Sequence, residues 1–263
     1  MAVCFFAVVS IYAATRKDLK VWSQSMNKDI PVVVIIPDKI SSESPCPVIY
    51  LLHGHGGNQD SWPGIKPNLG EIADRNGIIF VSPNGENSWY WDSPVNDKFR
   101  YETFISDELI KYIDKTFYTI DSSKGRAITG LSMGGHGAMW NGLRHSDVFG
   151  ACGSTSGGVD IRPFPDNWNM KDYLGNESEN QKRWDDYTVI NLVDGLEDGK
   201  QAIIFDCGVD DFFRDVNINL HKKLLEKKIK HDYIERPGSH NSEYWNNSID
   251  FQIMFFKKFF DKK

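Results

Sequence analysis

Short apolar runs alternate with amphipathic segments along most of this chain. Residues 48–52, 78–81 and 202–207 are almost entirely apolar, and each run is short enough for a buried strand. Residues 102–117 instead carry apolar side chains at positions 105, 109, 112, 113 and 117, which is a helical period. The complete pattern predicts strands over 30–37, 48–52, 78–81, 124–129, 148–154, 202–207 and 231–236, and helices over 68–76, 102–117, 135–143, 216–229 and 242–258.

This alternation predicts an α/β protein. Strands that alternate with helices form a mostly parallel central sheet with helices on both faces. The chain of 263 residues suits one large domain, which we place at residues 15–263. Residues 157–200 break the pattern, because they are polar and rich in Asp, Asn and Trp. We interpret this segment as an insertion over the sheet and over the active site, rather than as a second domain.

The first residues differ from the rest of the chain. Residues 2–14 form an almost unbroken apolar run that is too short to span a bilayer as a helix. The run is typical of the hydrophobic part of a signal peptide, although the positive charge that normally precedes it is missing, as in a truncated signal. We therefore expect residues 1–14 to be an export signal and the protein to be periplasmic or extracellular; a buried first strand is the alternative. No later segment is apolar enough to cross a membrane, so we expect no stable membrane insertion.

Charge and cysteine spacing exclude some partners. The net charge is −6 and no basic stripe is visible, which disfavours nucleic acid as a partner. The four cysteines (Cys4, Cys46, Cys152 and Cys207) show neither a C-x-x-C pair nor zinc-ligand spacing, so they predict no metal site. Eight tryptophans, many of them in predicted loops, suggest a surface for flat ligands such as sugars or aromatic rings.

The sequence Gly130-Leu131-Ser132-Met133-Gly134 matches the G-x-S-x-G pattern of a nucleophile elbow. It lies between a predicted strand and a predicted helix, which is the context that the pattern requires. A serine hydroxyl becomes a useful nucleophile when a tight turn exposes it and a base can reach it. The alternative is a Gly-rich turn that binds a phosphate at the start of the helix.

A nucleophilic serine needs a base and an acid, and in this class of fold they follow it in the order acid, then histidine. His240 lies in the loop after strand 231–236, at the carboxyl end of a strand. His221 falls on a predicted helix and His231 begins a strand, so we select His240. The acid should lie in the loop after strand 202–207, where Asp210 and Asp211 are equally well spaced. Asp206 lies within that strand and is less free to turn.

The oxyanion hole requires two backbone N–H donors. One should be the N–H of Met133, directly after the nucleophile. The other should come from the loop His53-Gly54-His55-Gly56-Gly57, whose glycines allow N–H groups to face a ligand. The competing interpretation, a metal pair of His53 and His55, lacks a third ligand.

Together these motifs resemble the esterase D-like family of α/β-hydrolases, which includes feruloyl and acetylxylan esterases, tributyrin esterases, S-formylglutathione hydrolases and mycolyltransferases. The resemblance covers residues from about 30 to 260. It implies an α/β-hydrolase fold, selects Asp211 as the acid, assigns the second oxyanion donor to the N–H of His55, and implies no metal or organic cofactor. The motifs that carry it are His53-Gly54-x-Gly56-Gly57 with Trp62, Gly130-Leu131-Ser132-Met133-Gly134-Gly135, Cys207-Gly208-x-x-Asp211, and Gly238-x-His240 with Trp245.

The function expected from the motifs and the resemblance is a serine carboxylesterase. Its substrates would be feruloyl or acetyl esters on sugars derived from plant polysaccharides, or small acyl esters. An export signal argues against the cytosolic S-formylglutathione hydrolases, and an Asp acid argues against the mycolyltransferases, which use Glu. Trp89 and Trp91 could stack on a sugar or a feruloyl ring, with ordinary packing as the alternative. Two other functions remain open: an acyltransferase to a sugar hydroxyl and a non-catalytic glycan-binding protein. The oligomeric state is not predicted.

Overall fold

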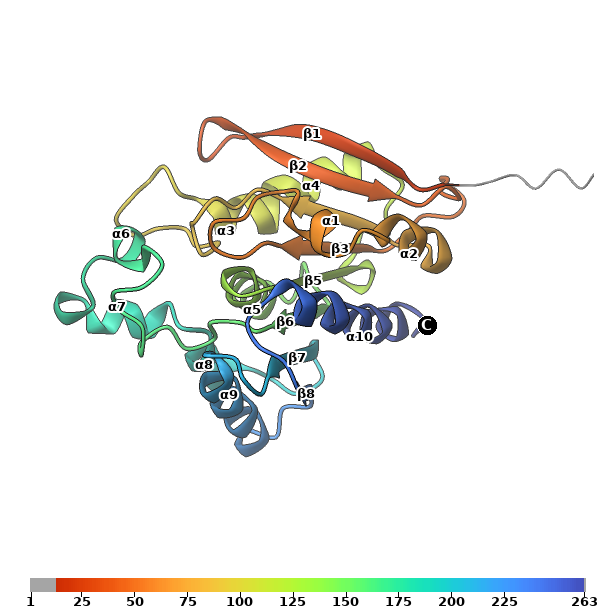
Figure 1. Cartoon of the computed structure of the whole chain (residues 1–263). Coiled ribbons are helices and arrows are strands. Elements are labelled where there is room, and N and C mark those ends of the chain that lie inside the picture. Colours follow the sequence, from red (N-terminus) through yellow and green to blue (C-terminus); the bar gives the residue numbers. More distant parts are fainter. Residues whose placement is uncertain (1–12, 263) are drawn as a thin grey trace, which may run out of the picture.

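The computed structural model describes residues 13–262, and its described strands form a single sheet (Figure 1). The strand order is β1-β2-β4-β3-β5-β6-β7-β8. β2 pairs antiparallel with β1 and β4, and all other neighbours are parallel, so the predicted mostly parallel sheet is confirmed. The strands are β1 (Thr15–Ser23), β2 (Lys28–Ile36), β3 (Val48–Leu52), β4 (Ile79–Pro83), β5 (Arg126–Gly130), β6 (Ala151–Thr155), β7 (Ala202–Gly208) and β8 (Asp232–Arg236).

Helices cover both faces of this sheet, as predicted (Figure 1). One apolar core includes residues of α1, α2 and α10, and the other includes residues of α4, α5 and α9. None of the helices in the described part of the chain is both long and apolar enough to cross a membrane. The helices are α1 (Ser61–Ile65), α2 (Leu69–Asn76), α3 (Tyr101–Thr103), α4 (Leu109–Thr116), α5 (Met133–Arg144), α6 (Met170–Leu174), α7 (Gln181–Asp186), α8 (Val189–Leu192), α9 (Arg214–Glu226) and α10 (Ser242–Phe260).

The central strand β3 shows why the apolar runs are continuous. Val48, Tyr50 and Leu52 point into one core, while Ile49 and Leu51 point into the other. Successive side chains of a strand lie on opposite faces, so a strand that is covered on both sides must be apolar at every position.

Several predicted boundaries differ from the structure. The helix predicted over 102–117 is divided into α3, a π-helical turn at Phe104–Glu108, and α4. β6 begins at residue 151 rather than 148, and neither β1 nor α1 was predicted. The predicted export signal falls almost entirely on residues 1–12, which lie outside the described residues.

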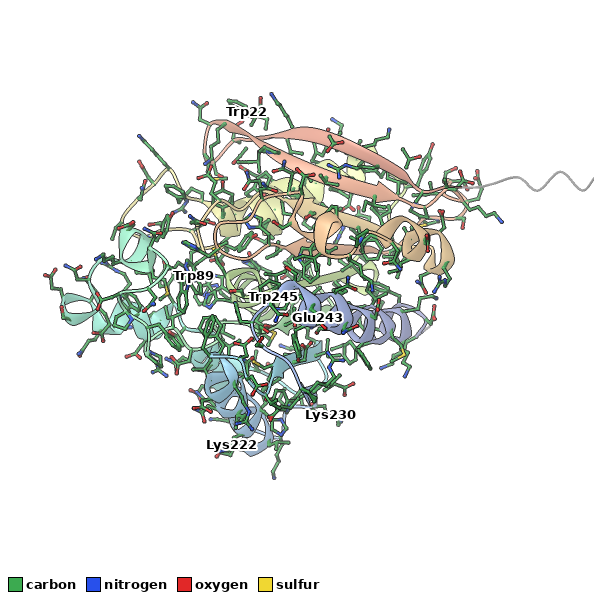
Figure 2. All side chains as sticks on the ribbon, viewed as in Figure 1. Trp22, Trp89, Lys222, Lys230, Glu243 and Trp245 are labelled. Carbon is green, nitrogen blue, oxygen red and sulfur yellow. The ribbon has the colours of Figure 1, made fainter. Side chains whose placement is uncertain are left out.

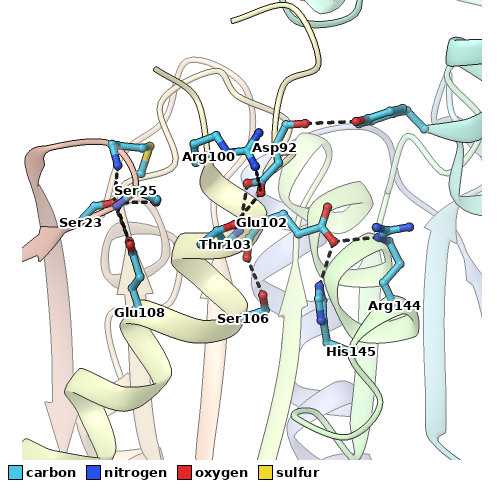
Figure 3. A network of polar contacts seen from close by, with 12 residues as sticks. Ser23, Ser25, Asp92, Arg100, Glu102, Thr103, Ser106, Glu108, Arg144 and His145 are labelled. Atoms are coloured by element: carbon cyan, nitrogen blue, oxygen red, sulfur yellow. Dashed lines mark hydrogen bonds and ion pairs between the residues drawn. The ribbon is translucent and has the colours of Figure 1, made fainter. Parts of the chain in front are cut away.

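A buried carboxylate anchors the end of α5 that lies away from the nucleophile (Figure 3). Glu102 Oε1 accepts hydrogen bonds from Arg144 Nε at 2.8 Å and from His145 Nε2 at 2.9 Å. Its Oε2 accepts a third from the indole N–H of Trp140 at 2.8 Å. Each bond to a charged group contributes about 1.5–3 kcal/mol when its geometry is good. These contacts fix the C-terminal end of α5 against α3.

The predicted insertion lies between β6 and β7 and contains α6, α7 and α8. Figure 1 shows it extending beyond one end of the sheet. Tyr187 of the insertion stacks on Trp140 of α5 with ring centres 5.3 Å apart. The insertion therefore packs directly on the helix that follows Ser132.

Candidate active site

Ser132 occupies a strained turn between β5 and α5. Its φ and ψ are 55° and −120°, a conformation that costs a non-glycine residue about 1–3 kcal/mol. A Cβ atom on Gly130 would lie 2.3 Å from the carbonyl oxygen of Gly134, and one on Gly134 would lie 2.2 Å from that of Leu52. Side chains do not approach backbone atoms so closely, so any residue larger than glycine would clash at both glycine positions of the G-x-S-x-G pattern. The turn exposes the hydroxyl of Ser132 at the carboxyl end of β5.

A chain of hydrogen bonds joins Ser132 to two residues from other loops. The Oγ of Ser132 donates to Nε2 of His240 at 2.9 Å. On the opposite side of the ring, Nδ1 of His240 donates to Asp211, 2.9 Å from Oδ2 and 3.1 Å from Oδ1. The structure therefore brings these three predicted residues together from the loops after β5, β7 and β8. The two alternative histidines, His221 and His231, instead contact each other at 2.8 Å.

Backbone geometry separates the two aspartates that spacing leaves equivalent. Asp211 is buried, and its Oδ1 also accepts a hydrogen bond from the N–H of Phe213 at 2.8 Å. Asp210 is exposed, and its N–H donates to the carbonyl of Gly238 at 3.0 Å. A Cβ on Gly208 would lie 2.3 Å from that same carbonyl, so the loops after β7 and β8 are in direct contact. In this arrangement Asp211, and not Asp210, reaches His240.

Asp206 is buried beneath the site and serves a different purpose. Its carboxylate accepts hydrogen bonds from Thr155 Oγ1 at 2.7 Å, Ser248 Oγ at 2.5 Å and Gln252 Nε2 at 2.7 Å. Burial raises the pKa of this carboxyl above its usual range, while the hydrogen bonds act in the opposite direction. The network connects β6, β7 and α10, and it occupies both carboxylate oxygens of Asp206.

The loop after β3 places His55 beside the nucleophile. A Cβ on Gly54 would lie 3.3 Å from the Cβ of Ser132, so this loop closely approaches the turn. His53 is buried, and burial lowers the pKa of its ring to about 4. Its Nδ1 donates to the carbonyl of Gly54 at 2.7 Å and its Nε2 accepts from the N–H of Gly85 at 2.8 Å. His53 is therefore a neutral structural residue. No group of three or more His, Cys, Asp or Glu side chains within residues 13–262 is arranged to hold a metal ion.

Met133, the other predicted oxyanion donor, is the first residue of α5. The first N–H groups of a helix have no acceptor within the helix, so they are free to bind an anion. Because Met133 directly follows Ser132, its N–H lies beside the nucleophile, at the positive end of the α5 dipole.

An open pocket of about 850 Å³ surrounds the hydroxyl of Ser132. The insertion contributes Trp168, which stacks on Phe212 with ring centres 5.6 Å apart. Phe212 in turn lies 4.2 Å from the ring centre of His240, and Trp245 packs edge-on against the same ring at 5.0 Å. The pocket is lined by Gly54, His55, Gly56, Gly57, Asp60, Ser61, Gly64, Ile65, Leu131, Ser132, Trp168, Phe212, His240, Ser242, Glu243, Trp245 and Asn246.

The prediction that Trp89 and Trp91 stack on substrate is wrong. Their side chains are 1% and 0% exposed, and neither lines the pocket. They stack on each other at 5.5 Å, and Trp91 donates its indole N–H to Nε2 of His136 at 2.8 Å. Trp89 donates to the carbonyl of Trp168 at 3.1 Å. Both residues belong to the core beneath the insertion, which is the packing alternative.

Sequence reasoning did not assign Trp168 and Phe212 to the site. The signal was present, since the insertion is rich in tryptophan and Phe212 directly follows Asp211. Tryptophans in the loop at 89–91 and in the insertion at 168 look alike in the sequence, and only the packing shows which of them faces the pocket.

Comparison with known proteins identifies the family of this chain. Residues 23–255 match a family model described as "Putative esterase". The chain belongs to this esterase family. An acetyl esterase from Caldicellulosiruptor saccharolyticus is 28% identical over 251 residues, covering 87% of this chain and 92% of that protein. An S-formylglutathione hydrolase from Arabidopsis thaliana is 25% identical over 255 residues, covering 88% of each. The solved structure of a ferulic acid esterase superposes with a TM-score of 0.81 at 28% identity, over 95% of this chain and 99% of that one.

These matches confirm that the esterase is a member of the esterase D-like family with an α/β-hydrolase fold. They extend over nearly the full length of the acetyl esterase and of the ferulic acid esterase structure. The protein is therefore a carboxylic ester hydrolase that acts on a small-molecule acyl ester.

Proposed function

We propose that this esterase uses Ser132, His240 and Asp211 as a catalytic triad. The hydrogen bond from Ser132 Oγ to His240 Nε2, at 2.9 Å, is the observation that carries the proposal. His240 takes the proton of Ser132 as the hydroxyl oxygen bonds to the ester carbonyl carbon. It then gives that proton to the departing alcohol, and an acyl-enzyme remains. Water attacks this ester by the same route, which releases the carboxylic acid and restores Ser132. Asp211 orients the ring and stabilises its positive charge.

The N–H groups of Met133 and His55 are proposed to bind the oxyanion that forms in each step. The position of Met133 at the start of α5 and the approach of the Gly54 loop to Ser132 support this assignment. Loss of one such donor typically costs about 2.7–4 kcal/mol of transition-state stabilisation.

The proposed substrates are acetyl or feruloyl esters on sugars derived from plant polysaccharides, or small acyl esters. The relatives named as acetyl esterase and ferulic acid esterase support this choice. The aromatic pair of Trp168 and Phe212 offers a flat apolar wall beside His240, which suits a feruloyl ring or the apolar face of a sugar. Export to the periplasm or the cell exterior is also proposed, and it rests on the apolar run at residues 2–14.

The test compares Ser132→Ala with the wild type and with Ser122→Ala, a control at an exposed serine. We expect Ser132→Ala to abolish hydrolysis of p-nitrophenyl acetate and labelling by a fluorophosphonate, while Ser122→Ala retains both. Unchanged activity of Ser132→Ala would refute the proposed nucleophile. Methyl ferulate, acetylated xylan and tributyrin, assayed side by side, would then identify the preferred ester. Failure to hydrolyse both methyl ferulate and acetylated xylan would contradict the proposed sugar-ester substrates.

A further inference from the structure

One carboxylate at the mouth of the active-site pocket has no partner among the described residues. Glu243 lies on the first turn of α10, three residues after His240, and its side chain lines the pocket (Figure 2). The residue is exposed, and its carboxylate forms no hydrogen bond or ion pair within residues 13–262. An acidic residue in the first turn stabilises a helix modestly, which gives Glu243 a structural role as well.

The other charged side chains near the mouth of the pocket have partners of opposite charge. Asp60, the other acidic residue of the lining, forms an ion pair with Arg16, which also pairs with Asp18. Lys66 lies behind Asn246 and is paired with Asp250 at 2.7 Å. No lysine or arginine among residues 13–262 lines the pocket itself. Among the described residues that line the pocket, Glu243 is therefore the acidic side chain without a cationic partner.

We propose that Glu243 makes this pocket select esters of uncharged alcohols and reject anionic ones. This inference rests on the proposed function, because it concerns the pocket around Ser132. A second negative charge that enters a solvated pocket near such a carboxylate changes kcat/KM by about three- to tenfold. The hydroxyl groups of sugars are neutral, so their esters meet no such barrier. S-formylglutathione carries two carboxylates and one ammonium group, so it is disfavoured although a hydrolase of that substrate is 25% identical to this chain.

The same charge affects the product. Hydrolysis of an acyl ester releases a carboxylic acid, which loses its proton to water near neutral pH. The resulting carboxylate is repelled by Glu243 as soon as it forms. Glu243 therefore promotes release of the acid and weakens inhibition by it.

A matched pair of substrates tests the proposal. The anion 4-acetoxybenzoate and the neutral 4-acetoxybenzamide differ only in a carboxylate and an amide, and both release acetate. We expect Glu243→Gln to raise the ratio of kcat/KM for the anion to that for the neutral ester by about threefold at low salt, and Glu243→Lys by up to roughly tenfold. High salt should reduce both increases, because mobile ions screen the interaction. Glu226→Gln removes an exposed charge at the end of α9, outside the pocket, and should leave the ratio unchanged.

Inhibition by the released acid provides a second measurement. The inhibition constant of acetate or ferulate should fall in Glu243→Lys and stay constant in Glu226→Gln. A ratio that remains at the wild-type value in both Glu243 variants at low salt would overturn the proposal. If the variants lose thermal stability but keep the wild-type ratio of kcat/KM for the two esters, Glu243 only stabilises α10 and the proposal is overturned. Failure of the proposed function looks different, because Ser132→Ala would then retain activity on the neutral ester.

Discussion

The side chains of Ser132 and His240 meet at 2.9 Å, although 108 positions separate them in the chain. Ser132 follows β5 and His240 follows β8, and both strands belong to the parallel part of the sheet. Because parallel strands end at one edge, loops that are distant in sequence converge there. The contact depends on three separate constraints: the strained turn at Ser132, the glycine contact between the loops after β7 and β8, and the anchoring of α5.

The first prediction separates the two neighbouring aspartates. Asp211→Asn should lower kcat by about 10³- to 10⁴-fold, because an amide can favour the wrong tautomer of His240 and cannot stabilise its positive charge. Asp210→Asn should leave kcat nearly unchanged, since that side chain is exposed and forms no contact with the ring. Kinetics with p-nitrophenyl acetate measure both. A greater loss at position 210 would contradict the observed hydrogen bond.

The second prediction distinguishes core tryptophans from pocket tryptophans. Trp91→Ala should lower the free energy of unfolding by about 3–5 kcal/mol, because the side chain is fully buried. Trp168→Ala should affect stability less and should raise KM for methyl ferulate by about two- to tenfold, which is the value of one aromatic contact. Urea unfolding and steady-state kinetics on both variants provide the test. The opposite pattern, with the KM effect at Trp91, would contradict the packing described above.

The third prediction concerns stability in acid. Burial lowers the pKa of His136 and of His53 to about 4, below the ordinary value of 6.5. Between these values the unfolded chain binds a proton at each ring and the folded protein does not, so stability falls as the pH drops from 6.5 towards 4. Each ring accounts for up to about 3 kcal/mol of this loss. His136→Gln should therefore unfold with a weaker dependence on pH over this range, as measured by urea titration at several pH values. An unchanged dependence would show that the proton uptake lies elsewhere.

The fourth prediction concerns the glycines of the elbow. Gly134→Ala should reduce activity by at least about 10²-fold, because its Cβ would displace the backbone that leads into the His55 loop. Gly195→Ala serves as the control, since a Cβ there meets open space. Activity and circular dichroism of both variants would show whether the loss is local. An active Gly134→Ala enzyme would mean that the loop can move without cost.

The sequence predicted the central strands and the position of the site because both follow strict rules. Strands covered on both faces must be apolar throughout, and the strand-turn-helix around Ser132 has a recognisable glycine pattern. β1 was missed for the converse reason. It is an edge strand that pairs, among the described strands, only with β2. Its exposed positions carry Arg16, Lys17 and Asp18, so no buried run marks it.

Two features could not be derived from spacing. Asp210 and Asp211 differ in the direction of their side chains, which is decided by the contact of Gly208 with the next loop. The sequence allows Trp89 and Trp91 either to stack on a ligand or to pack in the core, because both lie in a predicted loop. Their true environment depends on the insertion, whose short helices have no strong sequence pattern.

The aromatic cluster between α5 and the insertion gives this esterase an optical probe of its own. Trp89 and Trp91 are enclosed where the insertion meets the sheet domain, and Trp140 stacks on Tyr187 at the same place. Any motion that lifts the insertion would admit water to these indoles and shift their emission to longer wavelength. Binding experiments therefore need no added dye. A ligand that binds without changing the tryptophan fluorescence leaves the contact between the insertion and α5 intact.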